Sequence, residues 1–311
     1  MKHKRAICFA AGAVILLFIT SYLVSPREGV VYDIISTREK LAEIALEKDD
    51  TIDVLFAGDS LVFRAISPLQ IWGLTGITSY DLSDGAMRLC DQNVMIRNAC
   101  KTQKPKLLVL EADIMSMAAS PYKDDFALPT NLIERIFPIF HYHIFYKAWK
   151  PFEKGEDLSV LRKGYKPSDA VSPYEGSTDY MQEEAKPMVI EPLNQKYLGE
   201  ISAFCRDNSI ELLVLALPSA GNYNRETHKT IQEWSDAHDV TFLDMNLMWE
   251  DIGLDWNTDT KDGGDHMNSS GAEKVSAYIA DYLEENYELT DHRDDEFYED
   301  WNKDYNEAGL Y

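Results

Sequence analysis

The chain has 311 residues and a formal charge of −23, from 53 acidic and 30 basic side chains. Hydrophobic residues make up 45% of the sequence and aromatic residues 11%, which indicates a folded body rather than a disordered chain. Because so acidic a surface repels phosphates, we expect no binding to DNA or RNA. Cys90, Cys100 and Cys205 show no CxxC spacing, so neither a disulfide scaffold nor a thiolate metal site is expected.

The first segment predicts a membrane anchor. Residues 1–5 are basic and residues 6–24 are uncharged and apolar, long enough as a helix to span a bilayer core of about 30 Å. The basic side predicts a single-pass anchor in the cell membrane, with the N-terminus inside and the C-terminal domain extracellular. A cleaved signal peptide is the alternative, but no A-x-A site follows. The charged residues 25–50 are predicted to form a stalk.

From residue 51 onward, short apolar runs alternate with amphipathic segments. This rhythm is typical of βαβ units and predicts an α/β domain over residues 51–290, with a central parallel sheet of about five strands. The predicted strands are 52–58, 77–83, 105–112, 210–218 and 240–246, and the predicted helices are 88–103, 197–209, 230–239 and 271–287.

Two segments depart from this alternation. Residues 116–190 are rich in Pro and aromatic residues and then polar, which indicates an insertion that forms a lid over a site or a partner surface. Residues 291–311 are acidic with interleaved aromatic residues, and we expect this tail to run along the surface of the domain.

Ser60, in FAGDSL, follows the first predicted strand, where parallel sheets bind ligands. An Asp-Ser pair commonly caps a helix, but SPLQ is a capping box that begins at Ser67, with Pro68 at the first helical position. We therefore expect Ser67 to be the cap and Ser60 to be free for chemistry. Gly58 would permit a tight turn before it, so that the following N–H groups could face a developing oxyanion.

A nucleophilic serine needs a base, and His266 is the best placed of the seven histidines. It lies in DTKDGGDHMNSSGAEK, where a second capping box puts the start of the last helix near Ser270 and His266 at the same sheet edge as Ser60. Asp262 or Asp265 could orient the imidazole and stabilise its cation. Asp262 is preferred, because the two glycines after it could let the loop fold back.

FAGDSL and GGDHMNSSGAEK resemble the motifs of the SGNH (GDSL-type) hydrolase superfamily, over roughly residues 52–290. The resemblance implies a flavodoxin-like three-layer α/β/α sandwich, with Ser60 as nucleophile, His266 as base and an Asp as the third member of a triad. It also implies that Gly85, in DLSDGAM, joins Ser60 in supplying oxyanion-hole N–H groups. Two departures stand out: the G-x-N-D block of the family reads LEAD here, without the Asn, and no Asp stands three residues before the His.

The anchor and motif order are similar to those of the D-alanyl-lipoteichoic acid biosynthesis esterase and of polysaccharide O-acetyl esterases and transferases. This resemblance implies a cell-surface esterase or acyltransferase that acts on acetyl or D-alanyl esters of wall or surface glycans, through an acyl-serine intermediate and without a cofactor. A catalytically inactive binding or assembly protein of the same fold is the alternative, motivated by the missing Asn.

Three further features are candidates for binding. His143 and Trp149, in the aromatic part of the insertion, could line a substrate cleft, although histidines in such stretches are more often ordinary buried or interfacial side chains. DWNTD begins like a calcium-binding EF-hand loop, but Thr260 and His266 stand where Gly and Glu are required, so no metal is expected.

Overall fold

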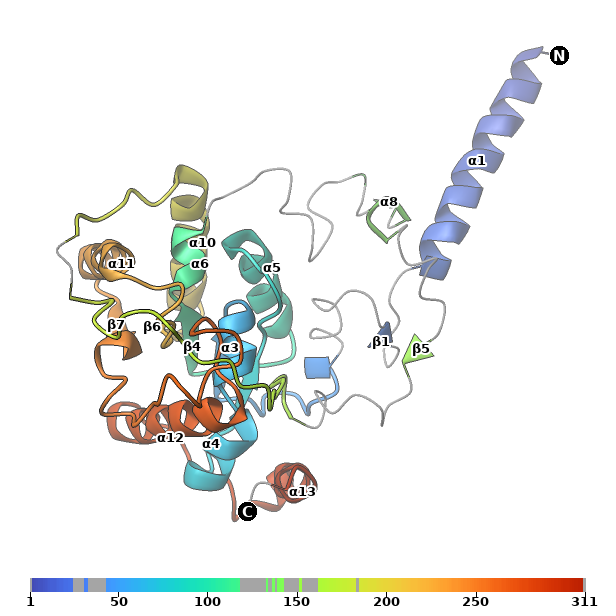
Figure 1. The fold of residues 1–311 in the computed structure, drawn as a ribbon. Coiled ribbons are helices and arrows are strands. Elements are labelled where there is room, and N and C mark those ends of the chain that lie inside the picture. The colour runs from blue at the N-terminus through green and yellow to red at the C-terminus, as the bar shows by residue number, and fades with distance from the viewer. Residues whose placement is uncertain are drawn as a thin grey trace.

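The computed structural model describes residues 2–24, 31–32, 43–117, 133, 136–137, 139–142, 151–152, 162–182 and 185–309 (Figure 1). Among these residues, five strands form one parallel sheet in the order β3-β2-β4-β6-β7. The strands are β2 (Val54–Ala57), β3 (Ser79–Asp81), β4 (Leu107–Glu111), β6 (Glu211–Ala216) and β7 (Thr241–Asp244). Each lies within one of the predicted apolar runs, so the predicted strands and the α/β class are confirmed.

The strands are buried on both faces, and alternate residues enter two different cores. In β2, Leu55 and Ala57 belong to one hydrophobic core, whereas Val54 and Phe56 belong to the other. Because successive strand residues point to opposite faces, such a strand requires helices on both sides of the sheet. Continuous apolar runs, rather than alternating ones, are the sequence signature of this arrangement.

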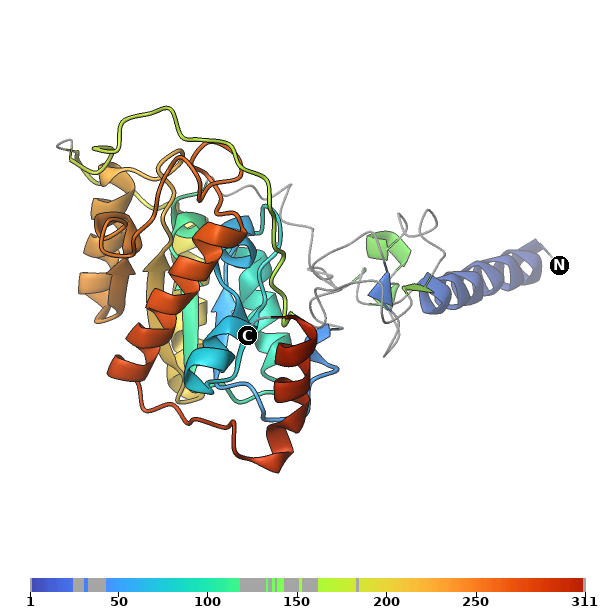
Figure 2. The same cartoon turned by 60° about the horizontal axis from the view of Figure 1, so that its bottom comes forward.

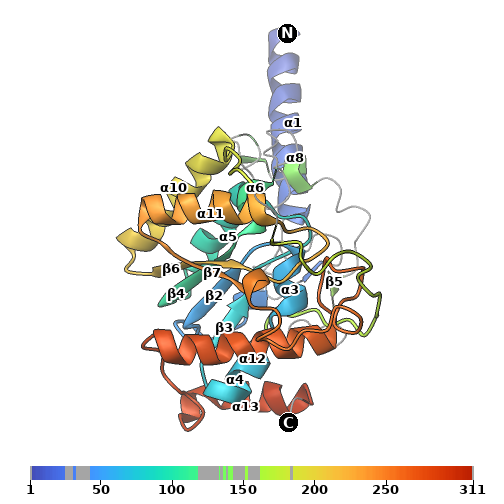
Figure 3. The same ribbon diagram turned by 60° about the vertical axis from the view of Figure 1, so that its left-hand side comes forward.

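Helices supply both outer layers of the sandwich, as Figure 3 shows. One face is covered by α5 (Leu89–Ala99), α10 (Pro192–Asp207) and α11 (Arg225–His238), and the other by α4 (Pro68–Thr75) and α12 (Ser269–Asn286). The short elements are β1 (Val31–Tyr32), which pairs with β5 (Pro151–Phe152), together with α6 (Asp113–Ser116), α8 (Ile139–Tyr142) and the 3₁₀ turns η2 (Met245–Leu247) and η3 (Glu296–Tyr298).

The N-terminal helix α1 (Lys2–Val24) contains an apolar stretch, Lys4–Leu23, with a mean hydropathy of 2.3. By length and composition this stretch can cross a membrane, as the sequence predicts. The orientation of the chain in a membrane stays a prediction.

The folded body begins before residue 51. Residues 25–50 were expected to form a stalk, but Ile44 is only 1% exposed within the core, and the Tyr80 hydroxyl donates to the Glu43 carboxylate at 3.3 Å. The last part of the expected stalk therefore packs as part of the domain.

The C-terminal tail returns along the body, and its helix α13 (Glu299–Glu307) lies beside α4 (Figure 2). Trp301 is 2% exposed and its ring centroid lies 5.4 Å from that of Trp72. The Lys163 ammonium sits 4.5 Å from the centroid of the Trp301 ring and pairs with Glu47 at 2.8 Å and Asp304 at 2.6 Å. The buried Lys163, which belongs to the expected insertion, thus joins the tail to the expected stalk.

Candidate active site

Ser60 lies just beyond the carboxyl end of β2, as the first residue of a short helix, α3 (Ser60–Ala65). The Asp59 carboxylate caps this helix by accepting the Leu61 backbone N–H at 2.9 Å. Helix α3 is not predicted from the sequence, because Ser67 already accounts for a cap there, and Ser67 does cap α4. The two caps serve two successive helices, and the Ser60 side chain is left for another partner.

Gly58 is required by a close approach rather than by a left-handed turn. A Cβ at this position would lie 2.5 Å from the Glu111 Cβ of the neighbouring strand's end and 2.5 Å from a Val62 methyl group. The absence of a side chain therefore allows β2 to run directly into α3 against β4. The chain passes from β2 into α3 within two residues here, and the close approach explains why this tight turn needs glycine.

The loop between β7 and α12 carries the candidate base. It folds back at Gly263 and Gly264, whose φ angles of 78° and 92° lie in the left-handed region that favours glycine. The Asn268 side chain then accepts the Gly271 backbone N–H at 3.1 Å and caps α12. The helix therefore begins at Ser269, close to the predicted start, and Asn268 rather than Ser270 is its cap.

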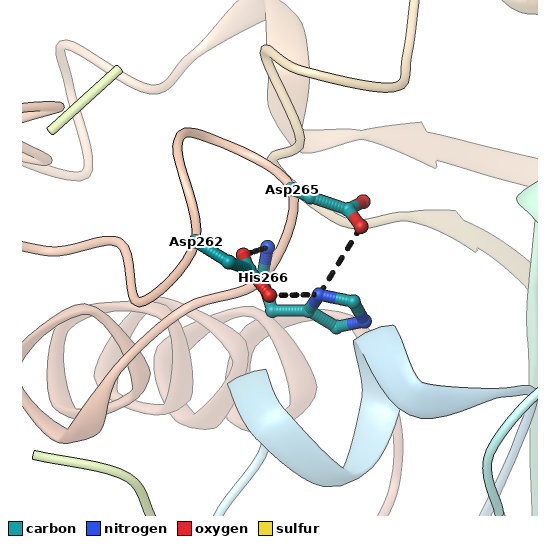
Figure 4. A group of neighbouring side chains, drawn as sticks. All are labelled: Asp262, Asp265 and His266. Atoms are coloured by element: carbon teal, nitrogen blue, oxygen red, sulfur yellow. Dashed lines mark hydrogen bonds and ion pairs between the residues drawn. The ribbon is translucent and has the colours of Figure 1, made fainter. Parts of the chain in front are cut away.

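This loop brings His266 to Ser60 across 206 residues of sequence. The distance from His266 Nε2 to Ser60 Oγ is 2.8 Å, within hydrogen-bonding range. Its other ring nitrogen, Nδ1, lies 2.8 Å from Asp262 Oδ2 and 3.2 Å from Asp265 Oδ2 (Figure 4). A proton on Nδ1, shared with these carboxylates, leaves Nε2 as the acceptor for the Ser60 hydroxyl.

Asp262 makes the more extensive contact of the two acids. Besides the imidazole, it accepts the His266 backbone N–H at 2.8 Å and pairs with the Lys261 ammonium at 3.0 Å. Partial burial acts to raise the pKa of Asp262, but the His266 N–H, the Lys261 ammonium and the imidazole together hold that pKa below its usual value. Asp262 is therefore an anion at neutral pH, as a group that stabilises an imidazolium must be.

Three buried carboxyl groups surround the strand ends behind Ser60. Burial raises the pKa of Asp59 to about 7, raises that of Glu111 well above its usual range, and raises that of Asp113. Neighbouring carboxylates add to these increases, Asp265 among them for Asp59 and Asp113. Sequence reasoning missed these acids as a group, although LEAD after a continuous apolar strand was the available signal, since its Glu and Asp had to lie at a buried sheet edge.

The two predicted oxyanion donors are the backbone N–H groups of Ser60 and Gly85. Ser60 begins α3, whereas the Gly85 backbone N–H donates to Asp84 Oδ1 at 2.7 Å, so it would have to exchange this bond to serve an oxyanion. An amide does reach the edge where the family's Asn is missing: Asn222, after β6, donates to Asp113 Oδ2 at 3.2 Å.

The remaining predicted binding groups are placed as follows. His143 and Trp149 lie outside the described residues. Within the described part of the chain, Asp262, Asp265 and His266 offer ligand atoms within 4.8 Å of one another, a spacing that could hold a metal ion. The direct bond from His266 to Ser60 favours proton transfer at this imidazole instead.

No family model matches the sequence, and no curated protein matches it. Among solved structures, a candidate acylhydrolase from Bacteroides fragilis shares 12% identity with a TM-score of 0.42, covering 82% of this chain and 99% of that one. A GDSL-like lipase from Bacteroides thetaiotaomicron shares 12% identity with a TM-score of 0.41, covering 80% and 98%. A candidate SGNH hydrolase from Slackia heliotrinireducens shares 8% identity with a TM-score of 0.43, covering 75% and 100%. At these levels of similarity, the function of this chain has to be inferred from its own side chains.

Proposed function

We propose that the protein is a serine esterase or acyltransferase of the SGNH type. The observation that carries the proposal is the 2.8 Å contact between Ser60 Oγ and His266 Nε2, with carboxylates on the opposite ring nitrogen. A serine hydroxyl is a weak nucleophile until an adjacent base takes its proton, and a carboxylate on the far side of that base stabilises the cation formed. Ser60, His266 and Asp262 supply these three roles.

The reaction would proceed in two halves. Ser60 Oγ attacks the ester carbonyl while its proton passes to His266 Nε2, and the imidazolium then donates that proton to the departing alkoxide. The resulting acyl-Ser60 is attacked by water in hydrolysis, or by an acceptor hydroxyl in transfer, with His266 taking the proton of the attacking group. The bond between the acyl carbon and Ser60 Oγ then breaks, and the imidazolium returns the proton to Oγ. The oxyanion would face the N–H group of Ser60 and, after exchange of its present bond, that of Gly85.

We further propose acetyl or D-alanyl esters of a wall or surface glycan as the substrate, and a cell-membrane location with the α/β domain outside. The apolar helix α1 and the basic residues at its N-terminal end support this placement. If the placement is right, the full chain should sediment with membranes, and a chain lacking residues 1–24 should be recovered in the soluble fraction.

A fluorophosphonate probe tests the chemistry, because it reacts covalently with an activated serine and needs no knowledge of the acyl group. The purified protein should be labelled at Ser60, and Ser60→Ala should not be labelled. Ser202→Ala is a matched control, since Ser202 lies on α10 and its hydroxyl donates to the Leu198 carbonyl of the same helix at 2.8 Å. Hydrolysis of p-nitrophenyl acetate should follow the same pattern.

The alternative is a catalytically inactive binding or assembly protein on the same fold. Two observations favour it: the edge after β4 offers Asp113 and no Asn, and the Gly85 N–H is already bonded. Loss of oxyanion donors costs catalysis about 3–4 kcal/mol per donor. A well-folded protein that neither reacts with the probe nor hydrolyses p-nitrophenyl acetate would support this alternative and contradict the enzyme.

A further inference from the structure

We infer that Ser219 is a positioning residue for His266, acting through Asp265, and that Asn246 holds Ser219 in place. This inference rests on the proposed function, since it concerns how the candidate base is oriented. Neither residue contacts Ser60 or His266 in the hydrogen bonds of the described structure, and neither belongs to a motif that the sequence offered.

Ser219 lies in the loop after β6 and is 1% exposed. Its hydroxyl donates to Asp265 Oδ1 at 3.3 Å, and Asp265 Oδ2 lies 3.2 Å from His266 Nδ1. One carboxylate therefore bridges the buried serine and the imidazole. A second contact braces the same two loops, because the Gly221 backbone N–H donates to the Gly264 carbonyl at 2.9 Å.

Asn246, in the turn η2 directly after β7, fixes the position of Ser219. Its side-chain oxygen accepts the Ser219 backbone N–H at 2.9 Å, and its amide nitrogen donates to the Leu217 carbonyl at 2.9 Å and to Asp244 Oδ1 at 3.0 Å. A backbone N–H can only donate, and a carbonyl or an ionised carboxylate can only accept, so these partners decide which way the Asn246 amide faces. Asn246 is 1% exposed.

The network ends at a buried histidine, His228. Asp244 Oδ2 lies 2.6 Å from His228 Nδ1 on α11, while the Tyr180 hydroxyl donates to the Asn246 oxygen at 3.1 Å. A connected chain of polar contacts consequently runs from α11 through β7 and the loop after β6 to His266. Its far end is anchored on α11 and β7, outside the loop that carries the base.

Asp265 needs such support because 40% of its side chain is exposed. A free carboxylate at the surface samples several rotamers, and only one of them places Oδ2 against Nδ1. The Ser219 bond selects the rotamer that faces the imidazole, so the imidazolium formed during the reaction is stabilised by two anions instead of one. Ser219→Ala should therefore make His266 a weaker base.

The charged and titratable groups that face His266 decide the sign of this effect. Asp262 and Asp265 contact Nδ1, Lys261 pairs with Asp262 from behind, and Asp59 and Asp113 lie toward the strand ends. Moving the Asp265 anion away disfavours the imidazolium, so the acid limb of the pH–rate profile should move to lower pH.

The test uses the full chain and the rate of fluorophosphonate labelling at Ser60 between pH 5 and 9. In Ser219→Ala, we expect labelling at pH 7 to slow by roughly 3- to 10-fold and the acid midpoint to fall by roughly 0.3–1 pH unit. With p-nitrophenyl acetate, kcat should fall and KM should stay unchanged. Ser219→Thr, which keeps the hydroxyl, should restore the wild-type midpoint, and the control Ser202→Ala should not differ from wild type.

A double variant separates an effect that acts through Asp265 from an unspecific loss of packing around Ser219. In an Asp265→Asn background, Ser219→Ala should cause no further change, because the serine acts only through that carboxylate. If Ser219→Ala fails to fold, the nearly isosteric Ser219→Cys should show the same shift.

Three outcomes have distinct meanings. Labelling of the wild type with an unchanged rate and midpoint in folded Ser219→Ala would overturn this inference alone, as would additive effects in the double variant. A wild type that is not labelled at all would contradict the proposed function.

Discussion

Asp262 and Asp265 approach the same imidazole nitrogen, but only Asp262 also accepts the His266 backbone N–H. Its two oxygens thereby fix both the ring and the main chain of the base. Asp265 instead accepts a hydrogen bond from the Ser219 hydroxyl. The two acids are consequently unequal, and Asp262 is the better candidate for the third member of the triad.

Asp262→Asn should therefore lower kcat by roughly 10²- to 10³-fold, less than the about 10⁴-fold known for a lone triad carboxylate, because Asp265 remains. Steady-state hydrolysis of p-nitrophenyl acetate measures the effect. Asp207→Asn, an exposed change at the end of α10, is the control. A kcat within twofold of wild type would show that Asp265 alone suffices to orient His266.

Gly58→Ala tests the close approach behind the nucleophile. Because its Cβ would meet two heavy atoms at 2.5 Å, the substitution should lower the free energy of unfolding by about 1–3 kcal/mol. Gly199→Ala is the matched control: it lies in the exposed part of α10 with nothing within 4 Å, and it should stabilise the protein by about 0.5–1 kcal/mol. Urea unfolding of both variants decides the point, and equal stabilities would rule out the steric account of Gly58.

At the scale of single elements, α3 begins on a carboxyl group that is buried where a cap is usually exposed. Burial raises the pKa of Asp59 to about 7, whereas an aspartate in an unfolded chain titrates near pH 4. Between these values the folded protein binds a proton that the unfolded chain has released, so this group lowers the stability as the pH rises from about 4 to 7.

Asp59→Asn should remove that loss, because Asn is also a good N-cap and does not ionise. The stability of the variant relative to wild type should increase by roughly 2–3 kcal/mol between pH 5 and 8, as measured by urea unfolding at both pH values. The control is Asp295→Asn, an exposed cap that accepts the Phe297 N–H at 2.9 Å, for which no such divergence is expected. A constant difference between Asp59→Asn and wild type would mean that Asp59 is ionised throughout this range.

At the scale of the whole molecule, segments from both ends of the chain close the α/β body. Lys163, 3% exposed at its side chain, joins Glu47 to Asp304, and Trp301 fills the space between the Lys163 ammonium and Trp72. The described part of the C-terminal tail thus lies along the surface of the body, as predicted, and Trp301 is the buried side chain that fastens it there.

Trp301→Ala should therefore lower the free energy of unfolding by about 3–5 kcal/mol, as expected for removing a buried indole. Phe297→Ala, in the same tail but 51% exposed, should cost less than about 1 kcal/mol. Thermal unfolding of the two variants distinguishes them, and similar melting temperatures would show that α13 contributes little to the folded body.

The sequence by itself determined the sheet and identified the serine and the histidine of the candidate site. The five strands are continuous apolar runs because both of their faces are buried, and that pattern is local in the sequence. Ser60 and His266 were identifiable because parallel strands end at one edge, so that residues 206 apart could be expected to meet there.

Only the tertiary structure decided how that site is held. The contact between Glu111 and Gly58, the partner of each acid and the link from His228 to Asp265 through Asn246 join segments far apart in the chain. Such contacts depend on side-chain direction and on distances of a few ångströms, which no local pattern records. For the same reason, the sequence predicted that the tail would run along the surface, but it did not predict which of the tail's aromatic side chains, Trp301, enters the core.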